Sequence, residues 1–506
     1  MTARETELKL MVEPGRLIRM RDHPAVRAQR LDRPATRRQV TTYFDTPERR
    51  LREMGLALRV REMGTRRILG LKDGGDALSG AVSRREWEVD TAGAAPDPAL
   101  LAQSPFASAF ADPAVLAALA PIFRTEVTRT LLRLGGAGWE VELCLDEGEI
   151  KAGDRRAAIA EAEFELKRGD TARLFTLARD LLGDDGAVIG TVSKAERGYA
   201  LADGRTFGPR KAAASTVTRG MSADDAFRAI ARGCLGHLLT NQAPFLDNGD
   251  PEALHQMRVA SRRLRSALKV FGALVPAASL GPLGDEMRWL AGLLGPARDM
   301  DVFVAEIIDP VRTALPDQPA LLALRDVFER RRAGFAEQAL TAVRTARFAR
   351  LMLDLGAWIE GGGWHSPDQP APLHADDFAR PVLMRLHRKL RKAGRRLDTL
   401  APAERHRVRI LVKKQRYAGE FFAPLWGAKA SRRYLGALAR LQDVLGEMND
   451  IEVARPHLTP SPAPADLPPL GAGLVMGWHA ARAESLRATM LDAWADWVAA
   501  DPFWEG

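Results

Sequence analysis

Residues 1–200 contain short segments in which polar and apolar residues alternate, and turn-forming residues separate several of them. Alternation with a period of two is typical of β-strands that have one apolar and one polar face. The pattern predicts helical segments at 98–120 and 170–183 and strands at 4–10, 39–44, 56–62, 67–72, 82–90, 127–134, 139–146 and 160–167. Eight strands in a segment of this length suit a closed antiparallel barrel.

From Ser222 onward the apolar residues are spaced by three and four, which predicts a helical C-terminal part. Proline-rich stretches at 366–372 and 459–469 interrupt this pattern. We therefore expect an α+β multidomain chain, with an eight-stranded antiparallel β domain followed by an all-α helical bundle. The predicted boundaries are 1–203 for the β domain, 204–218 for a linker and 219–506 for the helical domain.

The helical part contains an internal repeat. A motif of the form His-x-x-Arg-x-x-x-Arg/Lys-Arg/Lys-x-Arg begins at His255 and again at His406, which is an offset of 151 residues. A second motif, Leu-Gly followed by Asp four residues after the Gly, begins at Leu294 and again at Leu445 with the same offset. Two motifs that share one offset predict a duplicated helical unit, at about residues 222–360 and 373–500.

The net charge of +9 is concentrated in the helical part. Residues 1–203 contain 32 Lys and Arg and 32 Asp and Glu, so residues 204–506 hold 74 − 32 = 42 basic and 65 − 32 = 33 acidic residues. A basic excess of this kind favours a polyanionic partner such as nucleic acid, anionic lipid or polyphosphate.

Composition argues against several other classes of site. The two cysteines, Cys144 and Cys234, fit a reducing compartment and leave no ligand set for a cysteine-rich zinc site or a disulfide framework. The nine histidines form no HExxH motif or tight pair, which disfavours a histidine metal site. There is no run of about 18 apolar residues and no secretion signal, so we expect a cytoplasmic protein without membrane contact.

Most of the predicted strands carry charged residues on one face. Glu5, Glu7 and Lys9 share one face of their strand, whereas Thr6 and Leu8 take the other. Equivalent charged faces comprise Arg59 and Arg61; Arg84, Glu86 and Glu88; Glu140, Glu142, Cys144 and Asp146; and Glu161, Glu163 and Glu165.

These charged faces are either solvated outer surfaces or the lining of a wet barrel interior. In the second arrangement the apolar faces would pack against helices outside the barrel. Arg and Lys would then hold phosphate oxygens, and carboxylates would hold Mg²⁺ or Mn²⁺, which prefer oxygen ligands. Buried like charges are costly without partners, so such an interior would require bound ions and ligand.

An ordered set of motifs resembles the CYTH domain of the triphosphate tunnel metalloenzymes over about residues 1–203. The set comprises Glu5-x-Glu7-x-Lys9, Tyr43-Phe44-Asp45-Thr46-Pro47, Leu58-Arg59-Val60-Arg61, Leu71-Lys72, Arg84-Arg85-Glu86-Trp87-Glu88, Glu142-Leu-Cys-Leu-Asp146, Glu161-Ala-Glu163-Phe-Glu165 and Ser193-Lys194. The resemblance implies an eight-stranded tunnel that binds a triphosphate chain and divalent metals. Members of the family hydrolyse tripolyphosphate or thiamine triphosphate, cap RNA or cyclise ATP.

The resemblance also implies roles for individual residues. Phosphate-binding residues would be Lys9, Arg59, Arg61, Lys72, Arg84, Arg129 and Lys194. Metal-binding residues would be Glu5, Glu7, Asp146, Glu161, Glu163 and Glu165, supported by Glu86, Glu88 and Glu142. The predicted catalytic set is Glu5, Glu7, Lys9, Arg59, Arg61, Lys72, Glu163, Glu165 and Lys194. Gly70 stands where the family usually has threonine, which leaves every expected charge in place.

Basic residues recur along one stripe in each copy of the helical repeat. A helix advances about 100° per residue, which aligns His255, Arg258, Arg262, Arg265 and Lys269. The second copy aligns His406, Arg409, Lys413 and Arg416. A solvated helix face would explain either stripe, but basic groups without acidic partners at i+4 repel one another, which favours an anion-binding surface.

Both repeat motifs resemble the CHAD domain, over about residues 219–500. The resemblance implies binding of inorganic polyphosphate and association with polyphosphate granules. The implied binding residues are His255, Arg258, Arg262, Arg263, Arg265, Lys269, His406, Arg409, Lys413, Lys414 and Arg416. We expect Asp299 and Asp450, in the second motif, to orient arginines or cap helices.

The sequence therefore predicts a metal-dependent inorganic triphosphatase that hydrolyses tripolyphosphate to pyrophosphate and phosphate and binds long-chain inorganic polyphosphate. Two alternatives remain open: another triphosphate substrate, such as thiamine triphosphate or ATP, or a polyphosphate-binding protein without catalysis. Nucleic-acid binding is disfavoured because the basic half carries no recognised motif and offers few aromatic residues for base stacking.

Overall fold

The computed structural model describes residues 3–184, 186–365, 373–460, 462 and 464–505, so the predicted break at 366–372 lies outside the described residues. The chain forms two compact units. The barrel unit comprises Met1–Arg210, Leu235–Asn248 and Val343–Gly363, and the helical unit comprises Lys211–Cys234, Gly249–Ala342 and Trp364–Gly506.

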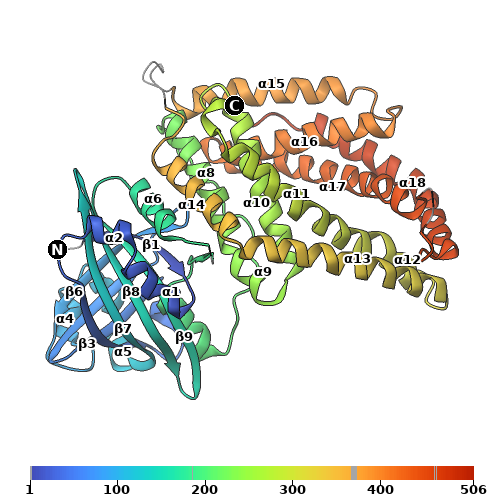
Figure 1. The fold of residues 1–506 in the computed structure, drawn as a ribbon. Coiled ribbons are helices and arrows are strands. Elements are labelled where there is room, and N and C mark those ends of the chain that lie inside the picture. Colours follow the sequence, from blue (N-terminus) through green and yellow to red (C-terminus); the bar gives the residue numbers. More distant parts are fainter. Residues whose placement is uncertain (1–2, 185, 366–372, 461, 463, 506) are drawn as a thin grey trace. The chain divides into compact units, whose positions relative to one another are not determined.

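Eight antiparallel strands form the closed barrel that the alternating pattern predicts (Figure 1, blue to teal). They follow the order β1-β9-β8-β7-β2-β3-β4-β6, and pairing of β1 with β6 closes the ring. The strands are β1 (Ala3–Met11), β2 (Ala35–Asp45), β3 (Leu56–Met63), β4 (Arg66–Asp73), β6 (Ala81–Asp90), β7 (Ala120–Gly136), β8 (Trp139–Ala152) and β9 (Arg155–Arg168). Two short strands, β5 (Asp76–Leu78) and β10 (Val188–Ile189), pair with β6 and β1.

The apolar faces of β3 and β4 pack outside the barrel, against short helical segments. Leu58, Val60 and Leu71 join Leu101 and Phe106 in one buried cluster. The covering segments are α3 (Arg50–Glu53), α4 (Pro98–Ala102), the 3-10 helix η1 (Ala107–Phe110) and α5 (Pro113–Ala117).

The predicted helical segment 98–120 is divided into three short helices, α4, η1 and α5. Proline lacks a backbone N–H and cannot continue a helix, so Pro113 begins a new one, and the side chain of Asp112 caps its first turn. Strand β7 already begins at Ala120, where the apolar alternation of the following residues takes over.

The other helices of the barrel unit are α1 (Pro14–Arg21), α2 (Pro24–Gln29), α6 (Ala172–Leu181), α7 (Lys194–Asp203), α9 (Gln242–Asn248) and α14 (Ala346–Glu360). Helix α6 occupies the predicted segment 170–183 and packs on α14. Their approach is close, because a Cβ atom on Gly356 would lie 2.4 Å from the ring of Phe175. Only glycine fits at this crossing.

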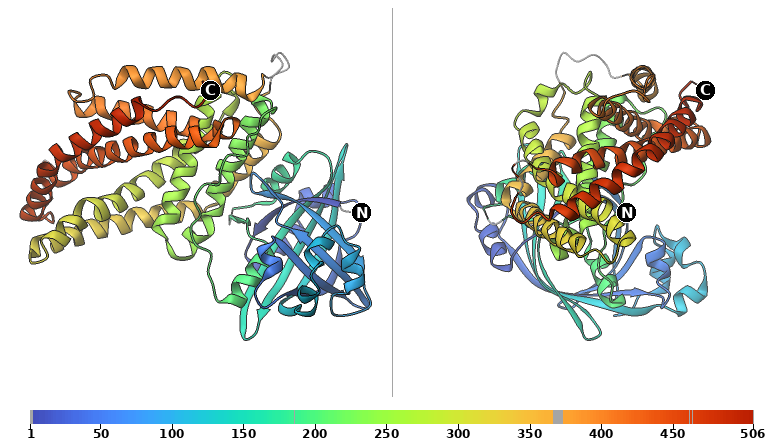
Figure 2. Two further views of the ribbon diagram at one scale, coloured as in Figure 1. Left: turned by 180° about the vertical axis from the view of Figure 1, so that it is seen from behind. Right: turned by 90° about the vertical axis from the view of Figure 1, so that its right-hand side faces the viewer.

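The helical unit confirms the C-terminal helical prediction (Figure 2). Its elements are α10 (Pro251–Val270), η2 (Ala277–Leu280), α11 (Leu283–Val302), the π-helix η3 (Phe303–Ile308), α12 (Asp309–Ala314), α13 (Pro319–Arg344), α15 (Ala375–Ala393), α16 (Pro402–Phe422), η4 (Ala423–Leu425), α17 (Ala428–Leu458) and α18 (Pro469–Val498), with α8 (Ala223–Thr240) shared between the units. The two helices that carry the repeated basic motif, α10 and α16, pack on each other. None of the described helices has the length and apolar character needed to cross a membrane.

Candidate active site and basic surface

The barrel encloses a cavity of about 530 Å³ whose lining is highly charged. All seven predicted phosphate-binding cations line it. The lining carboxylates include Glu5, Glu7, Glu86, Glu88, Glu142, Asp146, Glu163 and Glu165. The charged strand faces therefore lie inside the barrel, because the apolar faces of the same strands are buried on the outside.

Glu161 is the predicted site residue of the barrel that is not part of the cavity lining. Its side chain is fully buried. Lys194 pairs with one of its oxygens, and the Nη2 atom of Arg197 lies 3.3 Å from the other. The first turn of α7 thus covers Glu161 and separates it from the open part of the cavity.

Helix α7 places Lys194 at the cavity wall. Its first turn is fixed by reciprocal hydrogen bonds between Ser193 and Glu196, a capping box. Further along, the hydroxyl of Tyr199 donates to Asp45 Oδ2 at 2.9 Å. Asp45 also accepts from the backbone N–H groups of Leu51 and Arg52, so the Tyr-Phe-Asp-Thr-Pro motif anchors the elements around the site.

Four cations and four carboxylates form one ion-pair cluster inside the barrel. Lys72 Nζ lies 2.6 Å from Glu5 Oε2 and 3.1 Å from Glu86 Oε1. Arg59 Nη2 lies 2.7 Å from Glu86 and 2.8 Å from Glu88. The remaining pairs are Arg61 with Glu88 and Arg84 with Glu5 and Glu7.

A second cluster joins β1, β7, β8, β9 and α7. Glu163 is its centre: Arg129 Nη2 lies 2.6 Å, Lys194 Nζ 2.9 Å and Lys9 Nζ 3.0 Å from its oxygens. Asp146 is a second shared partner, at 2.6 Å from Arg129 and 2.7 Å from Lys194. The first cluster has four cations and four carboxylates, whereas the second has four cations, Arg197 included, and the three carboxylates Asp146, Glu161 and Glu163. Each of these buried charges lies near at least one opposite charge.

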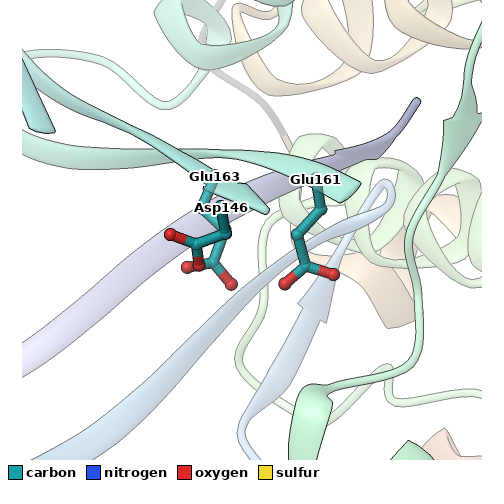
Figure 3. Close-up of side chains that lie close together, drawn as sticks. All are labelled: Asp146, Glu161 and Glu163. Atoms are coloured by element: carbon teal, nitrogen blue, oxygen red, sulfur yellow. The ribbon is translucent and has the colours of Figure 1, made fainter. Parts of the chain in front are cut away.

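Three carboxylates of the second cluster are arranged to hold a divalent cation. Asp146, Glu161 and Glu163 each offer an oxygen within 4.8 Å of the others, and their side chains extend to the same side of the sheet (Figure 3). Neither oxygen of Glu161 accepts a hydrogen bond of regular geometry from the described residues, despite the nearby cations. An all-oxygen donor set of three buried or nearly buried carboxylates fits Mg²⁺ or Mn²⁺.

The other three predicted metal ligands are not members of this trio. Glu7 is opposite Glu165 in the register of β1 with β9, and Glu5 is held by Lys72 and Arg84. Burial, and then the negative charge of Glu5, raise the pKa of Glu165 to about 7. Burial would also raise the pKa of Glu5, but the charges of Lys72 and Arg84 outweigh it and hold that pKa at about 2.

The cavity lining also includes Lys167, Phe207 and Arg210, which were not predicted as site residues from the sequence. Lys167 continues the alternation of Glu161, Glu163 and Glu165 along β9, so the pattern could have revealed it. Phe207 and Arg210 lie in the segment interpreted as a linker, where no periodicity marks them.

The helical unit carries a basic depression of about 450 Å³. Arg258, Arg262 and Arg265 of α10 line it as the stripe predicts, and Arg288 of α11 is an addition that the motifs do not include. Arg262 Nε donates to the hydroxyl of Tyr417 on α16 at 2.7 Å.

The two aspartates of the second motif each lie near an arginine of the first motif. Arg258 Nη2 lies 3.0 Å from Asp299 and its Nη1 donates to the carbonyl of Gly295 at 2.5 Å. In the second copy the Nη2 atom of Arg409 lies 3.9 Å from Asp450. The same contact thus recurs at both repeat positions.

The remaining basic positions differ in their surroundings. Arg263 and Arg416 both pair with Glu420, and His406 Nδ1 lies 2.5 Å from Asn449 Oδ1. Lys269 is exposed and Lys414 is half-buried. The basic residues of α10 therefore find some of their acidic partners on neighbouring helices, Asp299 on α11 and Glu420 on α16.

Burial and neighbouring positive charges lower the pKa values of four basic-motif residues, Arg265, Arg409, Lys413 and His255, and the last two shift furthest towards neutral pH or below it. Burial, followed by the charges of Arg262 and Arg409, lowers the pKa of Lys413 to about 7. Burial and the charge of Arg298 lower the pKa of His255 to about 4. At neutral pH His255 is therefore neutral, and Lys413 lies near its midpoint.

Comparisons with known proteins divide the chain in the same order as its motifs. A CYTH domain model matches residues 3–199, and a CHAD domain model matches residues 229–459. An inorganic triphosphatase from Haemophilus influenzae is 32% identical over 165 residues, which are 32% of this chain and 45% of that protein. The chain thus spans about half the length of this curated relative.

Two further relatives match a larger share of the chain. An uncharacterised protein from Mycobacterium tuberculosis is 28% identical over 367 residues, which are 67% of each chain. The crystal structure of a CHAD domain from the plant Ricinus communis matches with a TM-score of 0.50 and 35% identity, covering 57% of this chain and 98% of that one.

Proposed function

Because this chain carries a CYTH domain followed by a CHAD domain, we propose that it is a metal-dependent inorganic triphosphatase with an attached polyphosphate-binding domain. The substrate would be tripolyphosphate, hydrolysed to pyrophosphate and phosphate. The observation that carries the proposal is the barrel cavity, which is lined by all seven predicted phosphate-binding cations and by a similar number of carboxylates.

The cations would hold the phosphate chain. Arg59, Arg61 and Arg84 offer planar guanidinium groups that can bind phosphate oxygens in a bidentate manner, and Lys9, Lys72 and Lys194 act as point charges. Positive charge that is already in position stabilises the charge that develops on the phosphate oxygens during transfer. No covalent nucleophile is required.

Asp146, Glu161 and Glu163 would hold the Mg²⁺ or Mn²⁺, with Glu5, Glu7 and Glu165 as further carboxylates on the same wall. The bound metal would neutralise phosphate charge and lower the pKa of water. Glu165, whose pKa is about 7, can accept a proton from a water molecule that attacks the terminal phosphorus in line.

The test is phosphate release from tripolyphosphate by the full chain with Mg²⁺, Mn²⁺ or EDTA, alongside ATP and thiamine triphosphate. Lys9→Met and Glu7→Gln should each lower kcat/KM at least 100-fold, which is the range for removal of one preorganised electrostatic contact. Lys151→Met and Glu149→Gln are matched controls, because both residues lie on β8 outside the cavity lining. Retained hydrolysis in both cavity variants, with the fold intact, would refute the assignment.

The basic surface of the helical unit would bind inorganic polyphosphate. A linear polyanion gains affinity from many cationic contacts and the release of counterions, and Arg258, Arg262, Arg265 and Arg288 line one depression. Retention at polyphosphate granules would follow from the same contacts.

Competition between labelled polyphosphate and single-stranded DNA at matched salt tests this binding. Arg262→Gln with Arg265→Gln should weaken polyphosphate binding, whereas Arg440→Gln, which removes an exposed charge paired with Asp496, should not. Preference for DNA would overturn the polyphosphate assignment.

A further inference from the structure

The wall of the triphosphate cavity is not built by the barrel alone. Phe207 and Arg210, which follow the last helix of the barrel sequence, also line it. Gly204 ends α7 in the left-handed conformation, with φ 65°, and the backbone N–H of Arg205 donates to the carbonyl of Ala200 at 2.9 Å. This C-terminal cap fixes the direction in which the chain leaves the helix.

The backbone of Arg210 is held by one buried side chain. Asn241, in the turn between α8 and α9, is fully buried and belongs to the same compact unit as the barrel. The backbone N–H of Arg210 donates to Asn241 Oδ1 at 2.9 Å, and Asn241 Nδ2 donates to the Arg210 carbonyl at 2.9 Å. His237 Nε2 donates to the same carbonyl at 3.0 Å.

The amide of Asn241 is specific for this arrangement. Its second N–H donates to the carbonyl of His237 at 2.8 Å, so both donors and the acceptor are used. Leucine or alanine would offer none of these contacts. The position of Arg210 thus depends on a residue 31 positions later in the chain.

The side chain of Arg210 differs from the other cations of the cavity. Lys9, Arg59 and Lys194 are buried or nearly so, and each pairs with carboxylates. Arg210 is exposed and forms no ion pair within the part of the chain that the structure describes. A cation that lines the cavity yet faces solvent lies at its opening, with its charge available to an incoming anion.

We propose that Arg210 is a further phosphate-binding residue, positioned by Asn241, that extends the site towards linear polyphosphates of more than three phosphates. The inference rests on the proposed triphosphatase function. A guanidinium with a fixed backbone and unpaired donors is suited to the bidentate recognition of a phosphate group. The buried cations would hold three phosphates, and Arg210 would hold a fourth that protrudes from the opening.

The experiment compares tripolyphosphate with tetrapolyphosphate, using the full chain and Mg²⁺. Wild type should show the lower KM with tetrapolyphosphate, and Arg210→Ala should raise that KM about tenfold while changing kcat less, because one contact of about 1.4 kcal/mol is a factor of ten. Arg210→Lys should restore part of the loss. Lys211→Ala removes the neighbouring charge, which does not line the cavity, and serves as the matched control.

Asn241→Asp tests the positioning role, because it keeps the shape of the side chain and replaces the donating amide by an oxygen. It should raise the KM for tetrapolyphosphate in the same direction, and its effect should vanish in the Arg210→Ala background. Additive effects in the double variant would show that Asn241 acts on stability and does not position Arg210.

Calorimetric binding of both polyphosphates in EDTA separates the two proposals. The role of Arg210 is supported if the wild type binds tetrapolyphosphate more tightly than tripolyphosphate and Arg210→Ala abolishes this preference. This holds even if no hydrolysis is observed. Equal effects of Arg210→Ala and Lys211→Ala, or no preference for tetrapolyphosphate in wild type, overturn that role even if hydrolysis succeeds. Failure to bind either compound overturns both proposals.

Discussion

Polyphosphate binding by the helical unit should weaken as the pH rises through neutrality, because of Lys413. Burial and the charges of Arg262 and Arg409 lower the pKa of this residue to about 7, and Arg258 adds to the effect while Asp450 opposes it. In the free protein Lys413 is charged at pH 6 and mostly neutral at pH 9. A bound polyanion favours the charged form, so binding must draw a proton onto the lysine above pH 7.

The size of the effect follows from the two pKa values. If phosphate oxygens return the pKa of Lys413 to its ordinary value of about 10.4, Kd rises about tenfold per pH unit above 7. Between pH 6 and pH 9 this gives about a 100-fold loss of affinity, or about 2.7 kcal/mol. Partial restoration of the pKa gives a smaller slope of the same sign.

Fluorescence anisotropy with labelled long-chain polyphosphate, at constant ionic strength from pH 6 to pH 9, measures this slope. Long chains keep the titrating end groups a small fraction of the ligand. Lys413→Arg remains charged over the whole range and should bind with nearly constant affinity. Lys414→Arg, at the adjacent position, should keep the wild-type slope. Equal slopes in wild type and Lys413→Arg would refute the reasoning.

Three further perturbations test the barrel. Glu163→Gln removes one of the three carboxylates that would hold the metal, which is also the shared partner of Lys9, Arg129 and Lys194. The Mn²⁺ concentration for half-maximal activity should therefore rise at least tenfold. An unchanged Mn²⁺ titration would exclude Glu163 as a ligand. Gly198→Ala places a Cβ atom 2.0 Å from the ring of Phe123, and overpacking of this kind costs about 1–3 kcal/mol, seen as a lower urea midpoint. An unchanged midpoint would show that α7 moves freely. Tyr199→Phe removes the hydrogen bond to Asp45 and should lower the free energy of unfolding by about 1 kcal/mol in urea titrations; no loss would show that the bond contributes nothing net.

The strands of the barrel could be predicted because alternation is a local property. Glu5, Glu7 and Lys9 need only their immediate neighbours to define a charged face, and the structure turns that face inward. What alternation does not predict are the partners that are distant in sequence. Glu161 follows the same alternation, yet the first turn of α7 covers it, since Lys194 and Arg197 lie more than thirty positions away.

The helical site was predicted in part for the same reason. Periodicity places Arg258, Arg262 and Arg265 on one stripe of α10, and the structure keeps them together. Arg288 joins them only through the packing of α11 on α10, which no motif records. Arg210 is the clearest omission, because its place at the barrel cavity depends on the amide of Asn241 and not on any pattern around it.

The pairing of opposite charges inside the barrel has a consequence for the order of binding. A triphosphate that entered alone would pair with Lys9 or Arg59, and the carboxylates that now pair with these cations would lose their partners. A divalent cation that entered alone would bind the carboxylates and leave the ammonium and guanidinium groups without partners. When both enter, the phosphates pair with the ammonium and guanidinium groups and the metal pairs with the carboxylates, so neither set of buried charges is left without a partner. Metal and substrate should therefore enhance each other's affinity by the same factor, as linkage requires, and each should bind more weakly alone than in the presence of the other.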